Sequence, residues 1–180
     1  MSSIGIGRDL VSVYLAGSGN TVIASVRNDS DPTSSSLQDL RKGSDSTLII
    51  TQMDMCDEQS IVTAIKSLKV PKLDLVVANA GINQNFEFLV NLDTAALHRH
   101  VQVNAYAPLW LFQQTLPLLK KSTTPKFVSI TSIAGSITIL DETGKLNMGA
   151  YASSRALCNY FVKRLSVEVN DVAIWIIHPG

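Results

Sequence analysis

The segment YASSRALCNY, residues 151–160, places a tyrosine and an arginine four positions apart. The amphipathic pattern around it predicts a helix, and residues four apart in a helix lie on the same face. A tyrosine beside a positive charge can act as an acid–base catalyst, because the charge favours the phenolate form. Tyr151 and Arg155 are therefore the first candidates for chemistry; the alternative is two unrelated surface residues at helical spacing.

These residues need a scaffold, and the chain alternates strand-like and helix-like segments. Short apolar runs rich in β-branched residues predict strands over residues 21–26, 46–52, 73–78, 126–131 and 172–177. Amphipathic stretches predict helices over residues 6–16, 57–68, 93–120 and 149–169, with Asp57 as an N-cap. This alternation predicts an α/β fold, a doubly wound parallel sheet with helices on both sides. Ligands bind such sheets at the carboxyl ends of the strands.

Two positions near the first strand have the chemistry to hold phosphate groups. Gly5 and Gly7 lie at a predicted helix start, where backbone N–H groups and the helix dipole can hold a pyrophosphate. A tight turn is an equally good explanation of two glycines. Arg27 closes the strand at 21–26 and would suit a 2′-phosphate, whereas an acidic residue there would hold a ribose diol. Alternatively, Arg27 is simply an exposed arginine in a polar loop, because the low-complexity stretch 28–36 follows it.

Four other polar positions lie close to predicted strand ends or in a predicted helix. Asp54 and the segment Asn79–Gly81 follow the next two strands, and Ser132 follows the fourth. Each could be ordinary strand-to-loop punctuation. Asn104 lies in a long helical stretch, where a polar side chain can simply bond to backbone.

Composition narrows the class of protein. The chain has 180 residues, 46% hydrophobic content and zero formal net charge, which gives no indication of nucleic acid as a partner. It contains no apolar run long enough for a membrane span and no signal peptide. Cys56 and Cys158 fit no metal-ligand or redox spacing, so we expect no metal site and a reduced, cytoplasmic location. His98 and His100 are expected on an exposed helix without a role.

Taken together and in this order, the motifs resemble the short-chain dehydrogenase/reductase family. The resemblance covers nearly the whole chain. It rests on GIG (5–7), VIASVRN (22–28), MD (53–54), NAG (79–81), VNAYAPLWL (103–111), SITSIAGS (129–136), YASSR (151–155) and HPG (178–180). Within the family, the chain resembles fungal-type ketoreductases of secondary metabolism, through NTVIASVRN and the long interval between Ser132 and Tyr151.

The resemblance implies a cofactor site for NADP, with NAD less favoured. Gly5, Ile6 and Gly7 would approach the pyrophosphate, and Arg27 would contact the adenosine 2′-phosphate. Asp54 would meet the adenine edge. The remaining implied cofactor-binding residues are Asn79, Ala80, Gly81, Tyr151, Arg155, Pro179 and Gly180, the last two beginning the loop beneath the nicotinamide.

The resemblance also implies the catalytic residues. Ser132 would hold the carbonyl or alcohol oxygen of the substrate, and Tyr151 would pass a proton to it while the nicotinamide delivers hydride. Asn104 would anchor a water molecule in the proton relay. Arg155 replaces the lysine of the family pattern. It supplies the same charge, but its very high intrinsic basicity makes it a poor proton relay, so we expect a slowed enzyme.

A second departure concerns the ends of the chain. The family pattern begins with a strand and Thr-Gly, whereas here Met1 falls where the first glycine belongs. We therefore expect the fold to lack its first strand, which lies in the centre of such a sheet, and its C-terminal strand. Such a loss would leave two half-sheets with unpaired edges and exposed apolar faces.

These observations predict one partial dinucleotide-binding oxidoreductase domain over residues 1–180. Its expected activity is NADP-dependent reduction of a small-molecule ketone or aldehyde, or oxidation of an alcohol, with no nucleic acid or membrane partner. The resemblance also suggests a homodimer or homotetramer packed through the helices at 93–120 and 149–169. The alternatives are a dinucleotide-binding relative without full catalytic power, and an inactive fragment.

Overall fold

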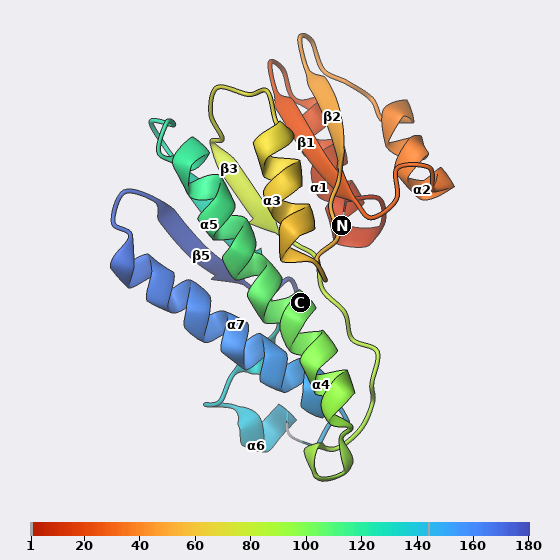
Figure 1. The fold of residues 1–180 in the computed structure, drawn as a ribbon, viewed down its shortest axis with the longest axis vertical. Helices are drawn as coiled ribbons and strands as arrows, with labels where there is room; N and C mark the ends of the chain where they lie inside the picture. Colours follow the sequence, from red (N-terminus) through yellow and green to blue (C-terminus); the bar gives the residue numbers. More distant parts are fainter. Residues whose placement is uncertain (1, 144) are drawn as a thin grey trace.

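The computed structural model describes residues 2–143 and 145–180 of the chain (Figure 1). Its strands are β1 (Thr21–Val26), β2 (Thr47–Gln52), β3 (Leu75–Ala78), β4 (Lys126–Ile130) and β5 (Ala173–Ile177). Its α-helices are α1 (Gly5–Ala16), α2 (Pro32–Ser35), α3 (Glu58–Ser67), α4 (Thr94–Val101), α5 (Ala107–Leu119), α6 (Leu140–Thr143) and α7 (Gly149–Glu168). Short 3₁₀ turns lie at Ser36–Asp39, Leu89–Asn91 and Ile133–Gly135.

All strands in the described residues lie within the predicted apolar runs, because branched side chains favour a pleated strand buried on its faces. Asp57 caps α3 as expected, since its side chain accepts a hydrogen bond from Gln59 N–H. The predicted helix at 93–120 is instead α4 and α5 joined by a π-helical segment, Gln102–Tyr106. The stretch 28–36, expected as a loop, contains α2, which begins at Pro32 because Asp31 caps its first turn.

The parallel sheet is split in two. β1 pairs with β2 in register from Thr21↔Thr47 to Val26↔Gln52, and a separate sheet has the order β3-β4-β5. This arrangement confirms the expected doubly wound fold with its central strand position open. Across the described residues, no strand bridges β1 and β3.

Helices cover one face of both half-sheets. α3, α5 and α7 lie in front of the strands, and α1 packs on β1 from the other side (Figure 1). The main core lies between α3, α5 and the strands β3 and β4, with Phe112 and Phe127 in edge-to-face contact at 5.0 Å. A smaller core joins α1 to β1 and β2.

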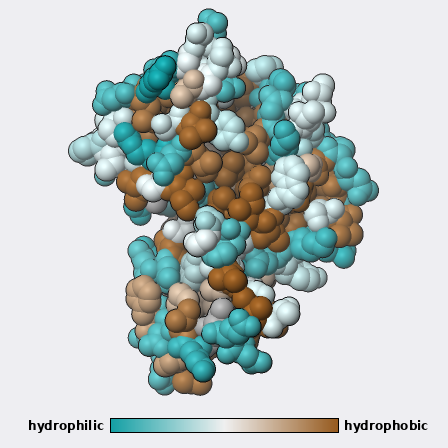
Figure 2. All heavy atoms as spheres, turned by 180° about the vertical axis from the view of Figure 1, so that it is seen from behind, coloured by the Kyte–Doolittle hydropathy of each residue, from teal (hydrophilic) through white to brown (hydrophobic). Residues whose placement is uncertain are grey.

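The last strand of the second half-sheet, β5, has little cover on either face near its carboxyl end. On β5, the side chains of Trp175, Ile176 and Ile177 are 47%, 38% and 44% exposed. Figure 2, which shows the molecule from behind, has apolar residues gathered in the middle of the view. The predicted exposed apolar faces are therefore present. In the described parts of the chain, no helix combines the length and apolar character needed to cross a bilayer.

Candidate active site

Ser132 lies two residues beyond β4, at the carboxyl end of that strand. It caps a 3₁₀ turn (Ile133–Gly135), since its Oγ accepts a hydrogen bond from Ala134 N–H at 3.2 Å. This turn packs directly on α7: a Cβ added to Gly135 would lie 2.7 Å from the backbone carbonyl carbon of Arg155. Only glycine allows so close an approach, so the turn that carries Ser132 is held against the helix that carries Tyr151 and Arg155.

Tyr151 and Arg155 face one another on the first turns of α7. The Arg155 guanidinium carbon lies over the tyrosine ring, 5.3 Å from its centroid, which is a cation–π contact. Arg155 is only 5% exposed, and its Nη1 donates to the Ile130 carbonyl at 3.1 Å. Within the described residues, Arg155 forms no ion pair with a carboxylate and its Nε has no hydrogen-bond partner. The site thus contains a buried positive charge with an unused donor.

Asn104 is fully buried in the π-helical segment. Its Oδ1 accepts from Ile82 N–H at 2.8 Å, and its Nδ2 donates to the Ile82 carbonyl and to Ser154 Oγ, both at 2.9 Å. A side chain that could merely have bonded its own helix instead joins the loop after β3 to α7. A π-helical turn widens the helix locally and is frequent at functional sites.

Asn79, Ala80 and Gly81 follow β3 directly and reach the same region. A Cβ on Gly81 would collide with Arg155 Nη2, so a larger residue there would displace the guanidinium. Asn79 and Ala80 line a cavity between β1 and β3. Pro179 and Gly180 follow β5 and are exposed, with Gly180 at φ +105°.

Gly5 and Gly7 lie in the first turn of α1. Ser2 N–H donates to the Ser25 carbonyl at 3.0 Å, which places this turn beside the carboxyl end of β1. Gly5 has φ +53°, a left-handed conformation that favours glycine, and a Cβ there would meet nothing within 4 Å. Ile4 at the N-cap provides no side-chain hydrogen bond to the helix. Ile6 in the same turn is 45% exposed.

Arg27 and Asp54 lie beyond the ends of neighbouring strands, and both side chains are exposed. The Arg27 carbonyl accepts from Gln52 Nε2 at 3.0 Å, which fixes the backbone where its side chain starts. Asp54 Oδ1 accepts from Cys56 N–H at 2.9 Å. A second arginine, Arg8 in α1, donates from Nη1 to Ser36 Oγ at 2.9 Å.

Sequence reasoning missed two residues that organise the site. Asn159 joins both sides of the Ser132 turn, accepting from Thr131 Oγ1 at 2.7 Å and donating to the Gly135 carbonyl at 3.2 Å. Its position eight residues after Tyr151, on the same face of a helix, was the available signal.

The second is His100, expected on an exposed helix surface and in fact 1% exposed. Its Nε2 accepts from Gln84 N–H at 3.2 Å, and its Nδ1 lies 2.8 Å from the Ala96 carbonyl. This imidazole holds the loop after β3 on α4. His98 on the same helix is exposed, as predicted.

The donor set fits a dinucleotide. Three groups suit phosphate or hydroxyl oxygens. They are the start of α1, where Gly5 is left-handed and no side chain caps the helix, the exposed Arg27 beyond β1, and the unused Nε–H of the buried Arg155. No group of three or more His, Cys, Asp or Glu is placed to hold a metal ion within residues 2–143 and 145–180.

Comparison with known proteins identifies the family of the chain. The short chain dehydrogenase family profile matches residues 2–180. The short chain dehydrogenase gsfK of Penicillium aethiopicum is 38% identical, over 98% of this chain and 71% of that protein. The norsolorinic acid ketoreductase of Dothistroma septosporum is 35% identical, over 99% of this chain and 69% of its own length.

Among solved structures, the carbonyl reductase from chicken fatty liver with bound NADPH has 28% identity and a TM-score of 0.88, covering 99% of this chain and 76% of that one. The predicted likeness to fungal ketoreductases is thus confirmed by sequence, and the fold by structure. This chain belongs to the short-chain dehydrogenase family of oxidoreductases.

Proposed function

We propose that this chain is a single dinucleotide-binding domain that reduces a ketone or aldehyde with NADPH, or oxidises the corresponding alcohol. The observation that carries the proposal is the buried Arg155 guanidinium over the Tyr151 ring, with the Ser132 turn packed on the same helix. A binding module would need none of these groups, whereas carbonyl reduction needs a proton donor, an oxygen-binding hydroxyl and a charge beside them.

Each residue then has a chemical role. Ser132 Oγ accepts from Ala134 N–H, so its own O–H is available to donate to the substrate oxygen. Tyr151 gives the phenolic proton to that oxygen as it becomes an alkoxide, and the charge of Arg155 stabilises the phenolate that remains. Bound nicotinamide would supply the hydride to the carbonyl carbon.

Asn104 acts in this proposal as a positioning residue that can also anchor a relay water. Its bonds to Ile82 and Ser154 hold the loop after β3 against α7, and Gly81 in that loop contacts Arg155. Asn79–Gly81, Pro179 and Gly180 form the surroundings of the nicotinamide end in this assignment.

The phosphate end of the cofactor is assigned to the first turn of α1 and to Arg27. The helix start offers uncapped N–H groups to the pyrophosphate, and Asp54 meets the adenine edge. Arg27 follows β1 with an exposed guanidinium and suits a 2′-phosphate. The NADPH bound to the chicken carbonyl reductase supports a nicotinamide dinucleotide as the cofactor, and the choice of NADP over NAD rests on Arg27.

The surroundings of Tyr151 favour an apolar substrate. The loop after β3 lies against the start of α7, since Gly149 N–H donates to the Glu87 carbonyl at 3.0 Å. This loop exposes Phe86 and Phe88, with side chains 65% and 47% exposed. The norsolorinic acid ketoreductase name of one relative supports a ketone as the substrate, and the two exposed phenylalanines suit an aromatic one.

The split sheet favours a second candidate, a cofactor-binding or inactive form of the same oxidoreductase. One assay on the purified chain separates them, using tryptophan fluorescence for NADPH binding and absorbance for NADPH oxidation with a panel of aryl ketones. Ketone-dependent oxidation supports the reductase. Binding without turnover supports the impaired relative, and no binding by a folded chain contradicts both.

A further inference from the structure

The turn that carries Ser132 makes few hydrogen bonds of its own. It is a 3₁₀ turn of three residues, Ile133–Gly135, in which Gly135 N–H donates to the Ser132 carbonyl at 3.1 Å. Such short 3₁₀ pieces have poor hydrogen-bond geometry. The position of the Ser132 hydroxyl therefore depends on contacts from outside the turn.

Those contacts come from α7, at two residues spaced four apart. Arg155 Nη1 donates to the last carbonyl of β4 at 3.1 Å. One helical turn later, Asn159 accepts from Thr131 Oγ1 at 2.7 Å and donates from Nδ2 to the Gly135 carbonyl at 3.2 Å. Since residues four apart share a face of a helix, Arg155 and Asn159 lie on the side of α7 that carries Tyr151.

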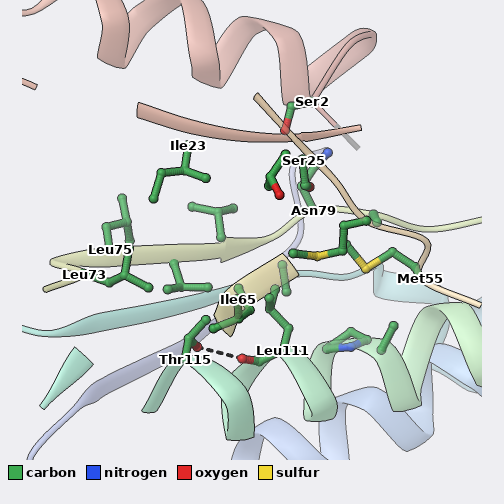
Figure 3. Close-up of a pocket in the computed structure, with 18 of the residues that line it drawn as sticks. Ser2, Ile23, Ser25, Met55, Ile65, Leu73, Leu75, Asn79, Leu111 and Thr115 are labelled. Carbon is green, nitrogen blue, oxygen red and sulfur yellow. Dashed lines mark hydrogen bonds between the residues drawn. The ribbon is translucent and has the colours of Figure 1, made fainter. Parts of the chain in front are cut away.

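The two Asn159 bonds enclose Ser132 in the sequence, one at the residue before it and one three residues after it. The Gly135 carbonyl can only accept, so the amide nitrogen of Asn159 must face it, which leaves the amide oxygen for the Thr131 hydroxyl. Thr131 is 5% exposed, so its bond is shielded from water. Neither Ser132 nor Asn159 lines the cavity between β1 and β3 (Figure 3), so this bridge is independent of the open strand position.

We propose that Asn159 is a positioning residue of the reductase site: it holds the Ser132 hydroxyl in place relative to Tyr151 and acts through Ser132 rather than on the substrate. This role rests on the proposed carbonyl reduction. Ser132 must meet the substrate oxygen at hydrogen-bond distance as charge develops on it, and a misplacement of about 1 Å can cost about 100-fold in rate. The alternative is that Asn159 only stabilises the fold.

A double-mutant cycle on the 180-residue chain tests whether Asn159 acts through Ser132. The measurement is single-turnover oxidation of NADPH with an aryl ketone. Ser132→Ala should slow this step by about 10²–10³-fold, since one donor to the developing oxyanion is lost. Asn159→Ala should slow it by about 10–100-fold. The double variant should be within about 2-fold of Ser132→Ala, because a displaced turn then has no hydroxyl to misplace.

Two variants of Thr131 remove one end of the bridge and decide the matter if Asn159→Ala does not fold. Thr131→Val keeps the shape of the side chain but loses the donor, and it should slow the step by about 3–10-fold. Thr131→Ser keeps the hydroxyl and should stay within about 2-fold of the parent chain. Combined with Ser132→Ala, Thr131→Val should add no further loss.

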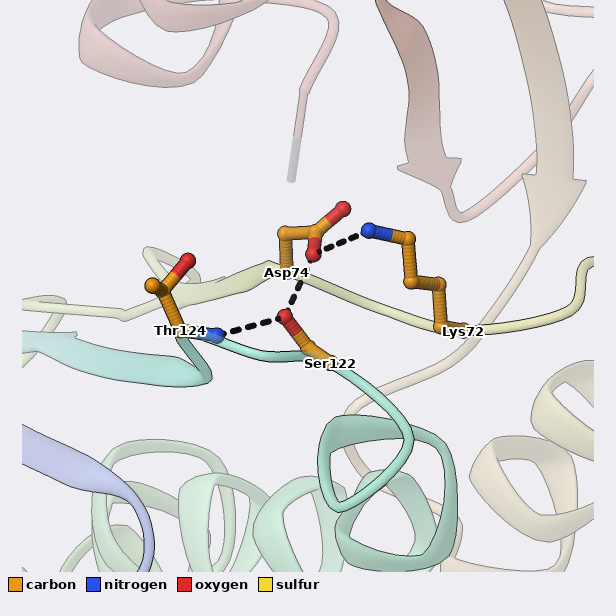
Figure 4. Close-up of polar contacts among 4 residues, drawn as sticks. All are labelled: Lys72, Asp74, Ser122 and Thr124. Atoms are coloured by element: carbon orange, nitrogen blue, oxygen red, sulfur yellow. Dashed lines mark hydrogen bonds and ion pairs between the residues drawn. The ribbon is translucent and has the colours of Figure 1, made fainter.

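The polar cluster at the amino end of β3 provides the control (Figure 4). Ser122 Oγ donates to Asp74 Oδ1, which also accepts from Lys72 Nζ at 2.8 Å. Like the Asn159 bridge, this bond ties a loop next to β4 to another element, but it lies before β4 rather than after it. Ser122→Ala should lower the midpoint of urea unfolding and change the single-turnover rate by less than about 2-fold.

Losses that multiply in the double variant would overturn the proposal, because Asn159 would then act independently of Ser132. Parent-like rates in both Asn159→Ala and Thr131→Val would overturn it as well, and so would an equal loss of rate in Ser122→Ala. A folded parent chain that binds NADPH but reduces no ketone would overturn the proposed function and this role with it. Multiplying losses in an active chain would overturn the role of Asn159 alone.

Discussion

The Arg155 guanidinium lies over the face of the Tyr151 ring, 5.3 Å from its centroid, and also donates to the Ile130 carbonyl at 3.1 Å. One side chain therefore does two things: it places a positive charge beside the tyrosine, and it ties the end of β4 to α7. Lysine has one compact ammonium group and cannot reproduce the planar contact that fills the space above Gly81.

Arg155→Lys is expected to raise kcat for ketone reduction, because a lysine ammonium can exchange protons with water and arginine cannot. The same change should lower the free energy of unfolding by about 1 kcal/mol, since the bond to Ile130 is lost. Steady-state kinetics and urea unfolding measure the two effects. Arg164→Lys, exposed on the same helix, is the control. A kcat that is equal or lower, with NADPH still bound, would contradict the relay argument.

Tyr151→Phe should reduce kcat by about 10²–10⁴-fold, the usual contribution of a general acid, while NADPH affinity changes little. Tyr160→Phe makes the same chemical change at an exposed position of α7, 65% exposed, and should be neutral. Single-turnover absorbance at saturating NADPH separates chemistry from binding. Retention of more than a tenth of the activity in Tyr151→Phe would exclude this tyrosine as the proton donor.

The sequence predicted the strands well because branched apolar runs have few alternatives. The split sheet was predicted from the resemblance to the family, because the residues before Gly5 contain no counterpart of the family's first strand. It could not predict the contact between Arg155 and Gly81, which depends on how closely α7 approaches the loop after β3. The burial of His100 also depended on tertiary packing, since its partner Gln84 lies sixteen residues earlier. The functional roles of the site residues remain predictions.

Arg27→Asp should weaken NADPH binding about 10–100-fold and NADH binding far less, because a charged hydrogen bond to the 2′-phosphate would be lost and a like charge introduced. Arg41→Asp makes the same charge change in the loop before β2, at the amino end of the sheet, and controls for net charge. Fluorescence titration with both nucleotides gives the two ratios. Equal losses of affinity for NADPH and NADH would mean that Arg27 does not bind the 2′-phosphate.

Asn104→Ala should lower the free energy of unfolding by about 2–4 kcal/mol, since it leaves the partly buried backbone groups of Ile82 and the buried Ser154 hydroxyl without their partner. Asn83→Ala, one residue beyond Ile82 and exposed, should cost less than about 0.5 kcal/mol. Urea unfolding measures both. If Asn104→Ala were as stable as the parent chain but lost turnover, its role would lie in the relay rather than in holding the loop.

Burial raises the pKa of the Cys158 thiol above its ordinary value, and a hydrogen bond with Ser129 and the charge of Arg155 oppose this only in part. The unfolded thiol loses its proton near pH 8.5, whereas the folded thiol keeps it to higher pH. Above that pH the unfolded state binds fewer protons, so stability falls as pH rises, by at most about 1.4 kcal/mol per pH unit for one thiol. Below about pH 8.5 both states are protonated and the thiol has no effect on the slope.

Urea unfolding between pH 7 and 10 should therefore show that the free energy of unfolding falls more steeply with pH for the parent chain than for Cys158→Ala. The variant should be less stable at every pH because it leaves a cavity, but its stability should change less with pH. Cys56→Ala is the matched control. Burial is also the first cause of the raised pKa of the Cys56 thiol, but this thiol is only half-buried. Its removal should therefore flatten the alkaline decline in stability less. Parallel pH profiles for the parent chain and Cys158→Ala would show that this thiol ionises alike in the folded and unfolded states.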